Sequence, residues 1–278
     1  MNVVINVGGQ KCGTTYLDSA VRQLGLARTT TGTKELHFFD TDKFDKGESR
    51  PYNSYFADSG PDVLFEATPA YLHMPGVAEK IAEYFAADSV KIIVLHREPV
   101  KRAVSQYLMN ISRGIENHES FEDALVHSLS MEKDFSYFRN FGYLERGLYH
   151  ANSSKYVELF GRENVFFYDQ KDLSDTQLLS AFLSRVFETE VVIPQDFTVA
   201  RENKGGKVNN PLLAMFYKIP AVRDLARKLM GDRFSHQLKK LFSSPIKNTT
   251  SADTIERLHS EYFADDYSMF KREFLNES

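Results

Sequence analysis

Residues 3–15 read VVINVGGQKCGTT. The first five of them are a short, β-branched run, which predicts a buried strand that enters a tight glycine loop. After the loop, apolar residues recur at helical spacing until Gly25, which is expected to end the helix. A strand, a glycine loop and a helix in this order expose backbone N–H groups at a helix N-terminus, where the helix dipole favours an anion. The stretch therefore predicts an α/β fold with an anion-binding loop.

The rest of the chain repeats this alternation of strands and helices. Short apolar runs predict further strands at residues 63–65, 91–95 and 165–168. Residues 75–87 and a stretch from Pro99 to about Arg113 predict helices between them. We therefore expect a P-loop-like central, mostly parallel sheet with helices on both faces. We see no linker or repeat, so residues 1–278 are expected to form a single domain, with 205–250 as a C-terminal helical appendage.

Composition narrows the class of protein. A chain of 278 residues with 42% hydrophobic and 26% charged residues is typical of a soluble globular protein. There is no apolar run of about 18 residues, and no pattern of a secretory leader before the first strand, so neither a membrane span nor a signal peptide is expected. The single cysteine, Cys12, excludes an internal disulfide and fits a reducing compartment, which predicts a cytoplasmic protein.

Charge is distributed unevenly along the chain. The net charge is −4, yet residues 201–247 hold eleven Lys or Arg against three Asp or Glu. Such a stretch is either the solvated face of a helix or a surface that faces an anionic donor, a substrate or a lipid headgroup. The second interpretation allows peripheral contact with a membrane.

The first loop has the residues of an anion-binding site. Lys11 supplies a charge, Gly13 allows close backbone approach, and the hydroxyls of Thr14 and Thr15 can donate to oxygens. The order differs from a nucleoside-triphosphate loop, where glycine, lysine and serine or threonine are consecutive, and no strand ends in an obvious Mg²⁺-binding aspartate. The histidines are not at metal-ligand spacing, so no metal is expected. Cys12 is interpreted as a small filler of the loop. The alternative is an ordinary glycine turn with a surface lysine.

A second candidate site comes after the strand at 91–95. Arg97 lies at its carboxyl end, the edge at which open α/β sheets bind ligands. Ser105 comes eight residues later, about two helical turns on, and returns to roughly the same side. An arginine with a hydroxyl makes a directional site for a phosphate monoester. An arginine that caps a core helix would give the same pattern.

Together these segments resemble the sulfotransferases that use 3′-phosphoadenosine 5′-phosphosulfate, particularly their bacterial and glycosaminoglycan-type branch. In that family a lysine-glycine-threonine loop holds the 5′-phosphosulfate, and an arginine-proline-arginine-serine segment holds the 3′-phosphate. The matching residues in this sequence are Lys11, Gly13, Thr14 and Thr15 for the first, and Arg97, Pro99, Arg102 and Ser105 for the second.

Other segments are similar to the same family in the same order. Residues 34–39 resemble the segment that carries its catalytic glutamate, and residues 65–71 resemble its substrate-side loop. Residues 146–149 have a counterpart, and so do residues 201–206, whose Lys204, Gly205 and Gly206 would lie near the adenosine end of the donor. The sequence departs from the family at Ala67, where glycosaminoglycan members often have lysine, and at residues 208–210, where many bacterial members have an arginine.

The resemblance implies transfer of a sulfuryl group to a hydroxyl or an amine. Lys11 would stabilise the leaving 3′-phosphoadenosine 5′-phosphate, and Glu35 would act as general base. His37 is a rival base, because in an extended segment its side chain would face the same side as that of Glu35; a structural histidine is the alternative. The implied acceptor is a carbohydrate, ahead of a lipid-linked or small-molecule hydroxyl, and no nucleic acid partner is expected.

Two other functions stay open from the residues. One is a small-molecule kinase with a variant phosphate loop, which lacks the usual lysine order and the metal carboxylate. The other is a non-catalytic nucleotide-binding module. The presence of Lys11, Glu35, Arg97 and Ser105 argues against a decayed enzyme.

Overall fold

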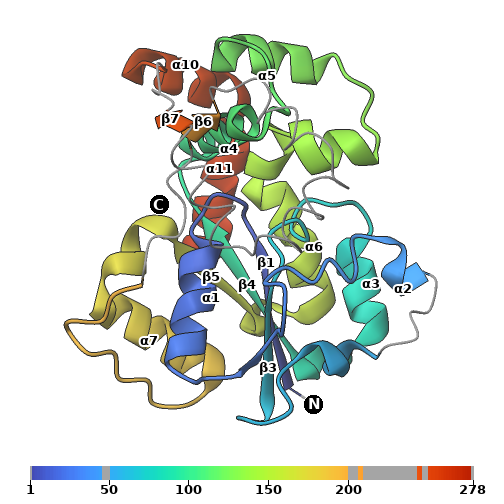
Figure 1. Ribbon diagram of the computed structural model, residues 1–278, viewed down its shortest axis with the longest axis vertical. Helices are drawn as coiled ribbons and strands as arrows, with labels where there is room; N and C mark the ends of the chain where they lie inside the picture. The colour runs from blue at the N-terminus through green and yellow to red at the C-terminus, as the bar shows by residue number, and fades with distance from the viewer. Residues whose placement is uncertain (1, 46–50, 200–205, 209–242, 246–249, 277–278) are drawn as a thin grey trace.

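A computed structural model describes residues 2–45, 51–199, 206–208, 243–245 and 250–276 (Figure 1). Its centre is a sheet of five strands in the order β2-β3-β1-β4-β5, and all neighbouring strands pair in parallel. The strands are β1 (Asn2–Gly8), β2 (Arg28–Thr29), β3 (Val63–Ala67), β4 (Val90–His96) and β5 (Val165–Asp169). This confirms the predicted parallel sheet. The strand β2 is not predicted from the sequence, because two residues are too short to show a period.

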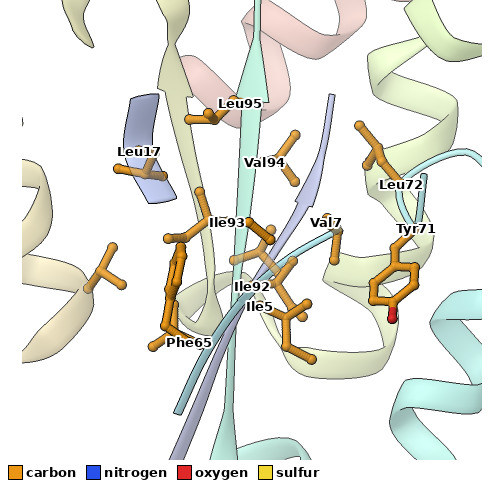
Figure 2. Close-up of a cluster of buried hydrophobic side chains, with 14 of the residues drawn as sticks. Ile5, Val7, Leu17, Phe65, Tyr71, Leu72, Ile92, Ile93, Val94 and Leu95 are labelled. Carbon is orange, nitrogen blue, oxygen red and sulfur yellow. The ribbon is translucent and has the colours of Figure 1, made fainter. Parts of the chain in front are cut away.

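The central strands are buried on both faces. Within β1 and β4 nearly every side chain is inaccessible to solvent, which explains why both read as continuous apolar runs. Figure 2 shows Ile5, Phe65 and Ile92, from three neighbouring strands, in one hydrophobic cluster with Leu17 of the first helix. The sheet is therefore a rigid support whose carboxyl edge can position functional loops.

Helices cover both faces of the sheet, as predicted. Figure 1 places α1 and α7 on one side and α3 and α6 on the other. The first seven helices in chain order are α1 (Thr14–Gln23), α2 (Asp42–Asp45), α3 (Val77–Tyr84), α4 (Pro99–Arg113), α5 (Phe121–Leu129), α6 (Tyr149–Phe160) and α7 (Thr176–Phe187). Short 3-10 turns lie at Tyr52–Tyr55, Ala87–Ser89, Glu145–Gly147, Arg162–Asn164 and Gln170–Ser174, and π-helical turns at Tyr137–Phe141 and Lys271–Leu275.

A second hydrophobic cluster lies above the carboxyl edge of the sheet. It joins α4 and α5 to the C-terminal helix α10 (Ala252–Tyr262), through side chains such as Val100, Phe121 and Leu258. The next helix, α11 (Ala264–Phe270), packs beside α6 (Figure 1). Neither α10 nor α11 is predicted from the sequence. The packing of α10 helps to fix α4, which carries one of the two candidate anion sites.

The predicted helical appendage at 205–250 lies largely outside the described residues. Its described pieces, β6 (Gly206–Val208) and β7 (Ser243–Pro245), are extended and pair antiparallel. The basic stretch at 201–247 falls mostly outside them too, so its helical form and its role in binding stay predictions. None of the helices in the described part of the chain is long and apolar enough to cross a bilayer.

Candidate active site

The first anion-binding loop forms at its predicted place. It connects β1 to α1, and Gly9 N–H donates to the carbonyl oxygen of Leu95 in β4 at 2.6 Å. Gly13 is the N-cap of α1 with φ of 89°, in the left-handed region that glycine tolerates best. The first turn of α1 has no side-chain cap and no acidic residue. Its N–H groups can therefore serve an anionic ligand.

Lys11 of this loop lies within the electrostatic field of three other cationic side chains. Burial is the main reason why the pKa of Lys11 is lowered, and the charges of Arg113, Arg97 and Lys34 lower it further. Lys11 is half-buried, so these repulsions are only partly screened by solvent. A ligand with two or more negative charges would relieve the repulsion, which is the chemistry expected of a phosphosulfate site.

Arg97 and Ser105 take the predicted positions at the carboxyl edge of the sheet. Arg97 comes directly after the last residue of β4, and Ser105 lies on α4; both are half-buried. Among the described residues, neither the Arg97 guanidinium nor the Ser105 hydroxyl has a hydrogen-bond partner. The charge of Arg97 lowers the pKa of Lys11, so the two side chains lie near each other on the same side of the molecule.

Arg102 has a different place from the one that the family resemblance implies. Its side chain is fully buried, and its guanidinium donates to Gln106 Oε1 at 2.9 Å and to the Tyr143 carbonyl at 2.5 Å. These contacts join α4 to the segment after the π-helical turn at Tyr137–Phe141. In this geometry Arg102 stabilises the interior and does not face a ligand.

Cys12 is a packing residue at the base of the first loop. Its side chain is fully buried, and Sγ lies 3.2 Å from the Tyr149 hydroxyl. Burial raises the pKa of the thiol to about 11, so it stays protonated at neutral pH. The same Tyr149 hydroxyl accepts the backbone N–H of Arg97 at 3.3 Å. Tyr149 therefore connects the two candidate anion sites.

The candidate base belongs to a chain of three ionisable groups. Glu35 Oε2 lies 3.3 Å from His37 Nε2, and His37 Nδ1 lies 2.7 Å from Asp40 Oδ2. Glu35 and His37 lie close together, as predicted. The extended backbone expected to bring them together is absent, however, because His37 has φ of 50°. Asp40 was missed from the sequence, although its spacing of three residues from His37 is a signal that could have found it.

Electrostatics assign different protonation states to Glu35 and His37. Hydrogen bonds with Asp40 and Glu35 raise the pKa of His37 to about 9, against the effect of burial. Burial raises the pKa of Glu35, but the hydrogen bond with His37 and the charge of Lys34 outweigh it, so the net shift is downward. At neutral pH the pair is an ionised carboxylate beside an imidazolium. Glu35 can accept a proton there, and His37 cannot.

Lys34 joins the candidate base to the first loop. Its Nζ donates to Thr15 Oγ1 at 3.1 Å and to Thr14 Oγ1 at 3.4 Å, and it lies 3.6 Å from Glu35 Oε1. From the sequence, Lys34 stands out only as part of the family segment at 34–39. The Lys34 ammonium thus lies between the Glu35 carboxylate and the hydroxyls of Thr14 and Thr15, which are expected to hold the donor.

The segment that carries the base has no regular secondary structure, yet side chains bind its backbone carbonyls. The carbonyl oxygens of residues 34–37 accept, in order, from Thr30 at 3.3 Å, Thr33 at 3.3 Å, Lys43 at 2.8 Å and Thr41 at 2.6 Å. These four bonds replace the ladder that a strand would supply. We call the segment Lys34–Asp40 the base loop.

A cavity of about 490 Å³ adjoins the base loop at Asp40. Phe39 of the base loop also lines it, and the other walls come from α3, the turn before α3 and the segment before α6; they include Met74, Lys80, Phe135 and Arg139. Of the predicted adenosine-side residues, Lys204 and Gly205 lie outside the described residues, and Gly206 begins β6. No cluster of His, Cys, Asp or Glu fit for a metal occurs in the described residues, and a metal-free site stays a prediction.

Comparison with known proteins gives a family match over most of this site. The family model described as "Sulfotransferase domain" matches residues 2–178. Mouse heparan sulfate glucosamine 3-O-sulfotransferase 5 is 26% identical over 190 residues, which cover 65% of this chain and 52% of the mouse protein. The membrane-associated sulfotransferase kil1 of Dictyostelium discoideum is 28% identical over 109 residues, 38% of this chain and 22% of that protein. The chain thus spans about half the length of the first relative and less of the second.

A solved structure has the same fold. The crystal structure of a sulfotransferase from Alicyclobacillus acidocaldarius superposes with a TM-score of 0.57 at 22% identity, covering 87% of this chain and 96% of that one. At this identity the likeness concerns the arrangement of the sheet and its helices.

Proposed function

The chain belongs to the sulfotransferase domain family, and we propose that it transfers a sulfuryl group from 3′-phosphoadenosine 5′-phosphosulfate to an acceptor hydroxyl. The observation that carries the proposal is the position of Lys34, whose Nζ is 3.1 Å from Thr15 Oγ1 in the first loop and 3.6 Å from Glu35 Oε1. Sulfuryl transfer needs an anion-binding loop and a proton acceptor on opposite sides of one sulfur atom, and this spacing suits that requirement.

The charges around the first loop fit such a donor. The charges of Arg113, Arg97 and Lys34 repel that of Lys11, and the N-terminus of α1 has no side-chain cap. A phosphosulfate would accept from these groups and from the loop hydroxyls. The Arg97 guanidinium and the Ser105 hydroxyl, which have no hydrogen-bond partner among the described residues, would hold the 3′-phosphate. We infer that Lys204, Gly205 and Gly206 approach the adenosine end, on the strength of the family resemblance.

The residues on the base loop supply the proton chemistry. The donor brings the sulfuryl group and a phosphate leaving group. Glu35 accepts the proton of the acceptor hydroxyl as the new O–S bond forms, a contribution of ~10²–10⁴ in rate. Lys11 stabilises the charge on the 5′-phosphate oxygen as the old O–S bond breaks. His37, protonated and bound to Asp40, keeps Glu35 ionised and oriented.

A carbohydrate is the proposed acceptor. The name of the mouse relative describes a glycan-modifying enzyme, and the cavity beside Asp40 combines aromatic and cationic side chains that suit a sugar ring with polar substituents. Ala67 lies where glycosaminoglycan members often have lysine, so that contact would have to come from other residues. The single, buried Cys12 supports a reducing compartment, and the cytoplasm is the proposed location.

The proposal is tested with purified protein, sulfur-labelled donor and a panel of glycosaminoglycan oligosaccharides, lipid-linked sugars and simple hydroxyls. We expect labelled product with a carbohydrate, and a fall in kcat of ~10²–10⁴ for Glu35→Gln with donor affinity nearly unchanged. The same assay with ATP and Mg²⁺ tests the kinase alternative. Phosphoryl transfer from ATP, or full turnover by Glu35→Gln, would overturn the proposal.

A further inference from the structure

A fully buried carboxylate lies beneath the base loop. Glu66, on β3, has 0% exposed surface. Thr68 Oγ1 donates to its Oε1 at 2.7 Å, and the Tyr52 hydroxyl donates to Oε2. The Tyr71 hydroxyl also acts on this carboxyl group and lowers its pKa. Among the contacts of the described residues Glu66 has no cationic partner. Burial raises the pKa of Glu66, and the hydroxyls of Tyr52, Tyr71 and Thr68 act in the opposite direction, so these hydroxyl protons are what stabilises its charged form.

Two of these hydroxyls also bind the backbone of the base loop. Thr68 Oγ1 accepts the N–H of Leu36 at 3.1 Å. The Tyr71 hydroxyl accepts the N–H of Phe38 at 2.8 Å and, less closely, the N–H of Phe39 at 3.4 Å. The N–H groups of Leu36 and Phe38 lie one residue after Glu35 and one residue after His37.

The direction of these hydrogen bonds depends on Glu66. A hydroxyl has one proton to donate, and an ionised carboxylate can only accept. Because Glu66 Oε1 takes the proton of Thr68, the lone pairs of Thr68 Oγ1 are left for the N–H of Leu36, and the Tyr71 hydroxyl beside the same carboxyl group accepts from the N–H of Phe38. A neutral amide at position 66 would present its own N–H₂ to one of the hydroxyls and oppose this arrangement.

We propose that Glu66 is a positioning residue which, through Thr68 and Tyr71, holds the base loop so that Glu35 and His37 lie in register with the donor loop. The inference rests on the proposed function, since it concerns the placement of the general base. The base loop is then bound on both kinds of backbone group. Side chains from residues 30–43 bind its carbonyls, and the hydroxyls of Thr68 and Tyr71, next to Glu66 of β3, bind its N–H groups. A loop without secondary structure thereby gains the fixed geometry that catalysis needs.

The kinetic test uses conservative changes and a matched control. Thr68→Val and Tyr71→Phe remove one hydroxyl each, and Glu66→Gln keeps the shape of the carboxylate. We expect each to lower kcat on the order of tenfold to a hundredfold, because misplacement by about 1 Å costs about a hundredfold, while donor Kd changes less than about twofold. Thr68→Ser, which keeps the hydroxyl, should restore kcat. The control is Tyr143→Phe, which removes the hydroxyl of a buried tyrosine that donates to Glu116 at 2.9 Å, away from the base loop.

A second measurement does not depend on turnover. In the wild-type protein the His37 imidazole should titrate by NMR with a pKa of about 9, and His37→Gln identifies its signal. In Thr68→Val and Tyr71→Phe the pKa should fall toward 6.5, because contact with Asp40 and Glu35 is lost. Thr68→Ser and Tyr143→Phe should leave it in place.

Two outcomes would overturn the inference. One is wild-type kcat and wild-type His37 titration in both Thr68→Val and Tyr71→Phe. The other is an equal loss of kcat in Tyr143→Phe, which would mean that any buried hydroxyl has this effect. If the wild-type protein shows no sulfuryl transfer, the proposed function fails, but the His37 titration still tests the positioning by itself.

Discussion

His37→Gln should destabilise the protein at pH 6 and have little effect at pH 10. The imidazole makes hydrogen bonds with two carboxylates, which raise its pKa to about 9, whereas in the unfolded chain it should titrate near 6.5. The folded pKa is the higher one, so the stabilisation is fully present below about pH 6.5 and is lost as the pH rises through about 9.

The structure sets the size of this effect. A span from 6.5 to about 9, at about 1.4 kcal/mol per pH unit, corresponds to roughly 3.5 kcal/mol. The His37 side chain is 30% exposed and the Glu35 side chain 41% exposed, so solvent screens part of the attraction. We therefore expect roughly 1–2 kcal/mol at pH 6.

The assay is urea unfolding of the wild type and of His37→Gln at intervals from pH 6 to pH 10. The difference in unfolding free energy between the two should be largest at pH 6 and fall toward zero by pH 10. His127→Gln, which replaces an exposed histidine on α5, is the control for a general effect of losing an imidazole. A difference that does not change with pH would refute the assignment of a charged His37 between two carboxylates.

Three further predictions concern the donor side. Lys11→Ala should weaken donor binding by roughly tenfold to a hundredfold, the worth of one charge-assisted hydrogen bond, and calorimetry giving the wild-type Kd would contradict its role. Arg97→Ala and Ser105→Ala should each weaken binding of 3′-phosphoadenosine 5′-phosphate but spare an analogue without the 3′-phosphate; equal weakening of both ligands in calorimetry would make these residues structural. Cys12, buried with a pKa of about 11, should resist iodoacetamide at neutral pH in the folded protein, and rapid alkylation seen by mass spectrometry would show that the loop opens.

The central strands of the sheet could be predicted from the sequence because they consist almost entirely of buried apolar residues. β1 and β4 are buried on both faces, so the apolar run and the strand coincide within a residue or two. The edge strand β2 has only two residues and shows no period. The helices α10 and α11 escape prediction because they are stabilised by packing on α4 and α6 as much as by their own pattern.

The site could be predicted from the sequence only in part. The first loop and Arg97 could be placed because residues directly after a buried parallel strand must lie at the carboxyl edge of the sheet. Glu35 came from the family resemblance alone, since an isolated glutamate in a loop carries no pattern. The family resemblance assigned Arg102 to the phosphate site, but its side chain is buried, and its partner Tyr143 is distant in the sequence, so the sequence carries no sign of this contact.

The hydrogen bond from the first loop to strand β4 bears on how such an enzyme could change its specificity. Gly9 is tied to Leu95 across the neighbouring strands β1 and β4, which lie about 4.8 Å apart, and Tyr149 connects Cys12 to the start of the next loop. If the two sites bind the phosphates of the donor as proposed, the spacing of these strands sets the span between those phosphates. A new acceptor would require only different side chains around the cavity beside Asp40, whereas a donor of another length would require a different sheet edge.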